Sequence, residues 1–267
     1  MYQIGWFSTG RGEGSRALLT TMHEAIQQGR VKAQIAFVFC SREPGDARGS
    51  DQYIELVKSY RIPLVCLSSR RFKTSAGEYL SAGWRLEYDR EAMKRLKGHS
   101  PDLCVLAGYM LIVGPEMCQR YTMVNLHPAA PGGPTGTWHE VIWKLIETQA
   151  SETGAMMHLV TPELDKGPPV TYCTFPIRGE PFDSHRKETK GLTVAQVKAR
   201  QGEENALFKL IRAEGVKREQ PLIVATVKAF AEGRVRVENQ RIVDSLGNAI
   251  EAYSLTREID RTVEDRP

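Results

Sequence analysis

Three polar side chains, Asn125, His127 and Asp165, carry the groups needed to move a one-carbon acyl unit between two nitrogens. An amide can donate a hydrogen bond to the oxyanion that develops on the acyl oxygen, and an imidazole can transfer a proton. A carboxylate beside the imidazole would orient the ring and favour its charged form. The three residues therefore predict a catalytic site for direct transfer that needs no thiol, hydroxyl nucleophile or metal ion.

Such residue types are common, and a lone histidine is more often structural than catalytic. The context favours chemistry, because Asn125 and His127 follow an apolar run at residues 121–124 that predicts a buried strand, and Pro128 ends it. Side chains at the exit of a strand into a loop are well placed for chemistry in an α/β sheet.

The composition sets outer limits on the class of protein. The chain has 267 residues, of which 41% are hydrophobic and 25% charged, and this suits one sizeable domain or one domain with an appendage. No run of about 18 apolar residues occurs, and the first residues lack the basic and then apolar pattern of a secretory signal. We therefore expect a cytoplasmic protein with no membrane partner.

The cysteine pattern and the net charge limit the kinds of ligand and partner that we expect. The five cysteines are scattered and form no CxxC pair, so a structural zinc site and a disulfide framework are not expected, and each thiol is interpreted as a small buried hydrophobe in a reducing compartment. They are Cys40, Cys66, Cys104, Cys118 and Cys173. The net charge of +4 is modest and favours small anionic ligands over extended nucleic acid.

Apolar and amphipathic segments alternate along the first part of the chain. Strands are predicted at residues 2–7, 34–40, 63–67 and 103–107, with helices at 15–28, 51–60 and 79–97 between them. The run at 103–107 is continuously apolar, as in a strand that is covered on both faces. This order predicts an α/β fold with a doubly wound, mostly parallel sheet and right-handed crossovers.

The pattern changes after residue 124. A loop at 131–136, a helix at 138–148 and strands at 156–160 and 170–175 would complete a catalytic core over residues 1–178. Residues 179–267 are expected to form C-terminal helices and a hairpin packed on this core, with a polar stretch at 184–203, a helix at 222–230 and hairpin strands at 234–237 and 242–245. For the tail at 251–267 three arrangements stay open: packing on the core, pairing between subunits, or a loose end.

A glycine cluster joins the first predicted strand to the first helix. Glycines there let backbone amides approach an anion, and the helix N-terminus adds a favourable dipole, although a tight corner is the alternative interpretation. The cluster lacks the Lys-Ser/Thr ending of an ATP-binding loop, so it predicts a monophosphate site. Glu13 would repel a phosphate if it pointed inward, and Arg11 and Arg16 would compensate. The predicted phosphate residues are Gly12, Glu13, Gly14, Ser15 and Arg16.

In this order, the glycine cluster, Asn-Leu-His-Pro at 125–128 and Glu-Leu-Asp-Lys-Gly-Pro at 163–168 resemble the formyltransferases that use 10-formyltetrahydrofolate. Gly154 and His-Leu-Val-Thr at 158–161 fall in the family's order as well. The resemblance covers about residues 2–178, continues more weakly through 221–233, and is strongest to the members that formylate phosphoribosylglycinamide in de novo purine synthesis. It implies a Rossmann-like formyltransferase fold, with His127 as proton donor, Asn125 as oxyanion partner and Asp165 as the group that favours the charged imidazole.

The same resemblance implies a folate site and no metal. The segment at 108–113 is similar to the loop that cradles the pteridine ring, residues 161–165 to its opposite wall, and Arg85 to an arginine that serves the folate, with a solvated surface position as its alternative. The residues implied to bind 10-formyltetrahydrofolate are Arg85, Met110, Leu111, Ile112, Val113, Asn125, Thr161, Pro162, Glu163, Leu164 and Asp165.

Departures from the family's pattern leave the amine acceptor open. The purine enzymes typically have Arg at the position of Leu111 and Asn at those of Glu13 and Arg16, and the Ser-Leu-Leu-Pro that usually follows the His-Pro pair is missing. The glutamate that binds the substrate amine has no clear counterpart, and Glu214 and Glu219 are the candidates.

The expected partners are thus a reduced folate and a phosphorylated amine acceptor, and the alternatives are an amino sugar nucleotide, a tRNA, or a non-catalytic folate- or nucleotide-binding relative. A methionyl-tRNA formyltransferase would be expected to have a C-terminal RNA-binding barrel, whereas the residues after 178 predict helices first. Formyltetrahydrofolate hydrolases would carry an N-terminal regulatory domain, whereas the first catalytic strand is expected to begin at Tyr2. The intact trio argues against a pure binder. Homodimerisation is an expectation from resemblance alone.

Overall fold

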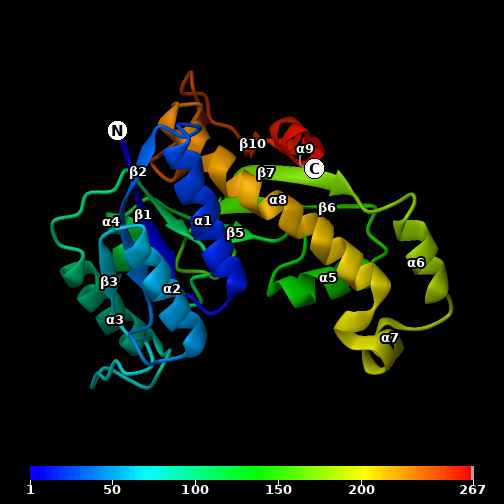
Figure 1. Ribbon diagram of the computed structural model, residues 1–267, viewed down its shortest axis with the longest axis horizontal. Helices are drawn as coiled ribbons and strands as arrows, with labels where there is room; N and C mark the ends of the chain where they lie inside the picture. The colour runs from blue at the N-terminus through cyan, green and yellow to red at the C-terminus, as the bar shows by residue number, and fades with distance from the viewer. Residues whose placement is uncertain (266–267) are drawn as a thin grey trace.

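An eight-stranded sheet forms the centre of the computed structural model, which describes residues 1–265 (Figure 1). Its strands follow the order β10-β7-β6-β5-β4-β1-β2-β3, and β6 runs antiparallel to β5 and β7 whereas the other neighbouring pairs are parallel. The strands are β1 (Tyr2–Ser8), β2 (Ala33–Cys40), β3 (Leu64–Cys66), β4 (Leu103–Leu106), β5 (Met123–His127), β6 (Glu152–Leu159), β7 (Pro169–Pro176) and β10 (Tyr253–Ser254). The predicted mostly parallel sheet is confirmed.

Helices cover both faces of this sheet. On one face, α1 (Glu13–Gln27), α2 (Arg48–Ser59) and the second half of α8 (Ala206–Ala231) pack on Ile4, Trp6 and Val38. On the other face, α3 (Ala82–Arg95) and α4 (Pro115–Arg120) pack on the intervening side chains, Phe7 and Phe39 among them. Because successive strand residues point to opposite faces, strands that are buried on both sides are apolar throughout.

A third apolar cluster lies to the side of the sheet. It joins α5 (Trp138–Glu147), α6 (Phe182–Glu188), α7 (Val194–Gln201) and the first half of α8 around Phe175 and Phe208. The helices α6 and α7 and the 3-10 turn η1 (Gly202–Glu204) largely coincide with the polar stretch at 184–203, where the sequence predicts C-terminal helices without giving their bounds.

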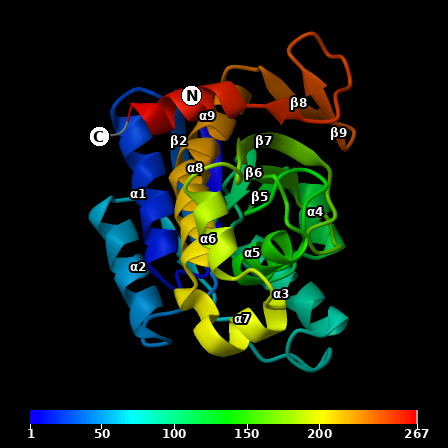
Figure 2. The same ribbon diagram turned by 90° about the vertical axis from the view of Figure 1, so that its right-hand side faces the viewer.

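The helix α8, in the C-terminal part of the chain, is much longer than the predicted helix at 222–230. Its first half mixes five charged residues with apolar ones such as Leu207, Phe208 and Ile211, and Pro221 lies inside the helix, so the sequence indicates only the mostly apolar second half, which is buried in the core. The predicted hairpin is present as β8 (Val235–Glu238) and β9 (Arg241–Asp244). Beyond it, β10 extends the sheet and α9 (Thr256–Glu264) lies against α8 and β7, with Leu255 and Ile259 buried (Figure 2).

Two further differences from the sequence predictions are local. The helix predicted at 79–97 begins at Ala82, where the Ser81 side chain accepts a hydrogen bond from the Trp84 amide and caps the first turn. The short helix α4 was not predicted. Among residues 1–265, no helix is both long enough and apolar enough to span a bilayer.

Candidate active site

The sequence predicts that Asn125 and His127 follow the end of a strand. In the structure they lie inside that strand. They belong to β5 because β6 pairs with it, placing Asn125 opposite His158 and His127 opposite Met156. The strand alternation points Asn125 and His127 to the same face of the sheet and Leu126 to the other. His127 is only 2% exposed, so its ring is fixed by packing.

Asp165 reaches this face from the loop between β6 and β7. The loop folds back closely on β6: the Leu159 amide donates to the Pro168 carbonyl, and a Cβ at Gly167 would lie 1.6 Å from the Leu159 oxygen. Asp165 itself has a left-handed backbone, with φ +54°. Its Oδ2 lies 4.0 Å from His127 Nδ1, longer than a hydrogen bond but short enough for one bridging water.

A second histidine, His158 of the His-Leu-Val-Thr motif, completes the cluster, and the sequence assigns it no role. Its Nδ1 lies 3.1 Å from the Leu159 carbonyl oxygen and its Nε2 lies 3.1 Å from Asn125 Nδ2. A neutral ring that donates from Nδ1 accepts at Nε2 from the Asn125 amide, and the other N–H of that amide stays available. The cross-strand pairing with Asn125 reveals this contact, and it cannot be read from sequence spacing.

The Asp165 carboxylate is held in its ionised form. In its protonated form the His158 ring, whose Nε2 lies 3.5 Å from Asp165 Oδ1, lowers the pKa of Asp165 most, and the nearby His127 lowers it further against the opposing effect of burial. The cluster therefore presents a fixed negative charge to the Nδ1 side of His127 at neutral pH.

The other ring nitrogen of His127 also faces an oxygen. Its Nε2 lies 3.0 Å from the Pro134 carbonyl, in the loop that ends where Thr137 and Glu140 form the capping box of α5. An imidazole with oxygen acceptors at both nitrogens can donate to both only when it is protonated. A substrate atom that accepts the Nε2 proton has to take the place of the Pro134 carbonyl.

Apart from Arg85 on α3 and Asn125 on β5, the residues implied to bind folate lie on two loops, at 110–113 and 161–165. Leu111 and Val113, after β4, and Val160, after β6, pack on the same apolar cluster. Met110 is 54% exposed and Leu164 is 60% exposed, so both loops present apolar side chains to solvent. Such exposed apolar surface suits a flat ring that would cover it.

The remaining residues of these loops are mixed in exposure. Ile112 and Thr161 are half-buried, and Pro162 and Glu163 are exposed. Thr161 donates its hydroxyl proton to the Glu163 carbonyl, which holds the wall loop in shape.

The loop after β4 is tied down by a buried carboxylate that the sequence did not single out. Asp89 on α3 is 3% exposed and accepts a hydrogen bond of 2.6 Å from the Gly114 amide. Burial raises the pKa of Asp89 to about 6, although this amide and the charge of Arg85 oppose the shift. Arg85 is half-buried, and its Nε is buried without a hydrogen-bond partner, so the solvated surface alternative does not describe it.

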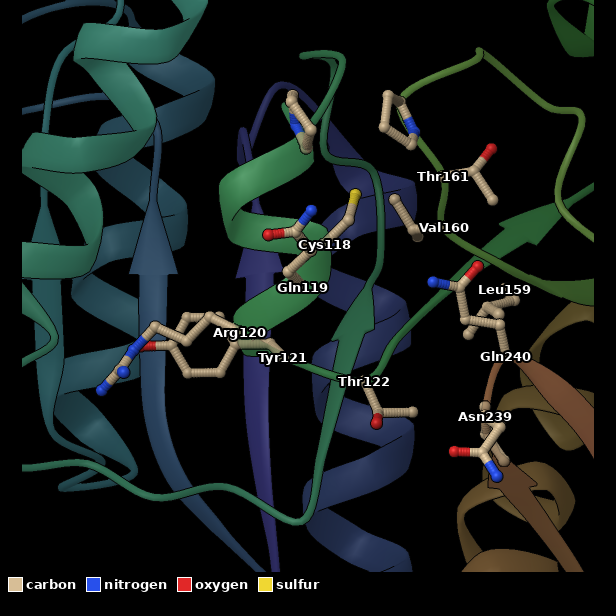
Figure 3. Close-up of a pocket in the computed structure, with 13 residues that line it drawn as sticks. Cys118, Gln119, Arg120, Tyr121, Thr122, Leu159, Val160, Thr161, Asn239 and Gln240 are labelled. Atoms are coloured by element: carbon tan, nitrogen blue, oxygen red, sulfur yellow. The ribbon is translucent and has the colours of Figure 1, made fainter.

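A cavity of about 370 Å³ lies behind the wall loop, between α4, the ends of β5 and β6, and the β8–β9 turn (Figure 3). It shares Thr161 and Pro162 with the predicted folate wall, but neither Met110 nor the trio lines it. The trio therefore lies outside this cavity.

The predicted phosphate loop is open, with one exception. The helix α1 begins at Glu13, and a Cβ at Gly12 or Gly14 would meet nothing within 4 Å, so the first-turn amides of α1 can be approached by an anion. Arg16 Nη1 is buried without a partner. Ser15 is the exception: it is buried, and its Oγ would lie 2.5 Å from a Cβ at Gly108, whose φ of +71° also favours glycine.

Both candidate glutamates for the acceptor amine are already paired. Glu219 forms an ion pair of 2.5 Å with Arg212, whose guanidinium lies 4.6 Å from the centre of the Trp138 ring. Glu214 pairs with Lys217 and Arg218 on its own helix. Neither offers a free carboxylate. Within residues 1–265, no three His, Cys, Asp or Glu side chains are grouped to hold a metal ion.

Comparison with known proteins gives a consistent result. The family profile described as formyl transferase matches residues 11–190. The chain is 34% identical over 168 residues to phosphoribosylglycinamide formyltransferase of Saccharomyces cerevisiae, covering 59% of this chain and 76% of the relative. It is 27% identical over 230 residues to the Haemophilus influenzae protein of the same name, covering 85% and 87%. The solved structure of phosphoribosylglycinamide formyltransferase from Coxiella burnetii superimposes with a TM-score of 0.68 at 20% identity, covering 95% of this chain and 98% of that one.

Proposed function

The chain belongs to the formyl transferase family, and from this premise we propose that it transfers the formyl group of 10-formyltetrahydrofolate to the amine of phosphoribosylglycinamide in de novo purine synthesis. The family membership supports the reaction type, and the names of the relatives support the acceptor. The observation that carries the proposal is the meeting of Asn125, His127 and Asp165 on one face of β5 and β6.

Asn125 is proposed to stabilise the oxyanion. When the acceptor amine attacks the formyl carbon, the carbonyl oxygen gains negative charge, and a fixed N–H donor favours that state. One N–H of the Asn125 amide is engaged by His158, which fixes the orientation of the other. The donor is thus preorganised before the reaction begins.

His127 is proposed to be the general acid. As the bond from the formyl carbon to folate N10 breaks, His127 gives its proton to N10, and the proton lost by the attacking amine restores the imidazolium. A general acid starts the reaction with a protonated ring, and the oxygens that face its two nitrogens would accept both N–H bonds, the Pro134 carbonyl directly and the Asp165 carboxylate through one bridging water.

The two substrates are proposed to enter from different sides of this cluster. The open first turn of α1 with Arg16 would take the phosphate of the acceptor, with Gly12, Glu13 and Gly14 around it. The loops at 110–113 and 161–165 with Arg85 would take the folate. Ser15 faces Gly108, so its part would be to hold the two loops together.

The test is a formyl-transfer assay with 10-formyltetrahydrofolate and a panel of amines. We expect transfer to phosphoribosylglycinamide, followed by the appearance of tetrahydrofolate and of the formylated product by mass. The panel includes an amino sugar nucleotide and a tRNA, and a reaction without acceptor measures hydrolysis. Transfer to another amine with none to phosphoribosylglycinamide would keep the reaction and reject the acceptor. Hydrolysis alone would reject both.

A further inference from the structure

Two cysteines face each other at the ends of neighbouring strands, outside the candidate active site. Cys40 ends β2 and Cys66 ends β3, and the two are opposite partners in the parallel register. Neighbouring strands lie about 4.8 Å apart, and partners in register point to the same face. That spacing falls inside the range of about 4.4–6.8 Å between the Cα atoms of a disulfide.

The surroundings give the two thiols different chemistry. Cys66 is half-buried, and Lys58 and Arg95 lie near it, with Glu43 as the opposing charge. The neighbouring Cys40 thiol lowers the pKa of Cys66 most, and the two cations add to this effect against burial. Cys40 is completely buried, and the neighbouring Cys66 thiol and burial raise its pKa. Cys66 is therefore the nucleophilic thiol of the pair.

The other three cysteines lack this combination. Burial raises the pKa of Cys104, and it raises the pKa of Cys118 and of Cys173 to about 11 in each case. In the strand register, Cys104 lies opposite Gly5 and Met123, and Cys173 lies opposite Ala155. The interpretation of every cysteine as an inert buried hydrophobe therefore fits these three better than Cys66.

We propose that Cys66 and Cys40 form a thiol-oxidation site, in which Cys66 reacts with a low-molecular-weight disulfide such as glutathione disulfide and Cys40 resolves the adduct. The Cys66 thiolate attacks one sulfur of the reagent, forms a mixed disulfide and releases one glutathione as its thiolate. Cys40 then gives up its proton and attacks Cys66 Sγ, which releases the second glutathione. The protein loses two hydrogen atoms as protons and two electrons, and the reagent is reduced to two thiols.

The position of the pair links it to the predicted phosphate loop. Ser41 directly follows Cys40, its amide donates to the Ser8 carbonyl, and its hydroxyl donates to Thr9 Oγ1. Thr9 in turn accepts from the Met110 amide. Because of these hydrogen bonds, a new covalent bond at the end of β2 is expected to shift the loops that follow β1 and β4.

The experiment uses the full-length reduced protein treated with oxidised glutathione, quenched with acid and mapped after alkylation under non-reducing conditions. Trypsin cleaves after Lys32, Arg42, Arg61 and Arg70, so that peptides 33–42 and 62–70 each carry one cysteine. We expect these two peptides to appear cross-linked, the intact mass to fall by two hydrogen atoms, and dithiothreitol to reverse both changes. A lasting glutathione adduct on peptide 62–70 with Cys40 still alkylated would overturn the proposal.

Variants separate the two roles. Cys40→Ala should leave the glutathione adduct on peptide 62–70, Cys66→Ser should abolish the cross-link and the adduct, and the matched control Cys118→Ser should form the cross-link as the parent does. A further measurement needs no variant: in the native protein, iodoacetamide should label Cys66 at least about tenfold faster than Cys118, because the lower pKa gives more thiolate. Faster labelling of Cys118 would refute the assignment of Cys66 as the nucleophile.

Discussion

The proposed reaction centre and the predicted phosphate loop are organised in opposite ways. His127 and His158 are 2% and 3% exposed, and each of their ring nitrogens lies near a protein oxygen or amide. In the phosphate loop, by contrast, Gly12 and Gly14 face open space and Arg16 Nη1 has no partner. The side chains proposed for the chemistry are thus held before any ligand arrives, whereas recognition of the acceptor phosphate would be completed by the ligand.

The difference follows from where each region lies in the fold. Asn125, His127 and His158 are fixed by the hydrogen-bonded register of β5 and β6, so their relative positions follow from the sheet. Gly12 and Glu13 lie at the start of a helix, where backbone amides have no partner within the helix. Mutations on the sheet should therefore act on the rate of reaction, and those at the helix start on the affinity for the acceptor.

The largest effect is expected from His127→Ala. Loss of the proposed general acid should lower kcat for formyl transfer at least about 100-fold, with a smaller effect on the KM of either substrate. Steady-state assays measure this loss, and circular dichroism checks the fold. The matched control is His185→Ala, which removes a histidine paired with Glu188 on α6. Near-normal turnover of His127→Ala would remove the chemistry from this cluster.

Asp89→Asn tests whether the loop after β4, like the side chains on β5 and β6, is held in place before a ligand binds. Since burial raises the pKa of Asp89 to about 6 from 3.8, the folded protein holds this proton in a range where the unfolded chain releases it. The stability that this group contributes is complete below pH 3.8 and is lost as the pH rises through 6, on the order of 3 kcal/mol. The amide in Asp89→Asn does not titrate, so this pH dependence of the free energy of unfolding is absent from the variant.

Urea unfolding of both proteins between pH 4 and about 7 measures the effect. The free energy of unfolding of Asp89→Asn should gain on that of the parent as the pH rises. Asp260→Asn, at a side chain that is 42% exposed, is the control and should follow the parent. Parallel curves for the parent and Asp89→Asn would show that this carboxyl titrates as it does in the unfolded chain.

A smaller effect is expected from His158→Gln, which keeps a polar partner for Asn125 but removes the ring beside Asp165. The pKa of Asp165 is lowered chiefly by this ring, so it should rise in the variant and move the acid limb of kcat to higher pH. At neutral pH, kcat should fall about tenfold, less than for the proposed acid itself, with KM little changed. An unchanged pH profile would indicate that His158 only fills space.

Much of the fold could be predicted because each sheet strand that is buried on both faces is apolar at consecutive positions, as in Trp6 and Phe7. The end of β5 was placed too early because Asn125 and His127 are polar, and their pairing with β6 is a long-range contact. The contact of His158 with Asn125 depends on the same pairing, so the sequence alone does not predict it. Asp89 lies in a polar helix, where nothing local distinguishes a buried carboxyl from an exposed one.

The smallest effect is expected from Glu13→Gln, in the predicted phosphate loop. This exposed carboxylate lies in the first turn of α1, where it would repel a bound phosphate, so the variant should lower the KM of the phosphorylated acceptor about twofold and leave kcat unchanged. The gain should shrink as the ionic strength rises, because exposed charges are screened. Steady-state assays at several salt concentrations measure both.

Glu24→Gln is the matched control, because it removes the same charge from an exposed position near the other end of the same helix. Its KM should equal that of the parent, since the carboxylate lies about 16 Å farther along the axis at 1.5 Å per residue, beyond the screening length at physiological salt. Equal changes in both variants would mean that net charge, and not the helix start, governs binding. A higher KM for Glu13→Gln would mean that this carboxylate binds a positive or hydroxyl group of the acceptor, and the predicted phosphate position would then be wrong.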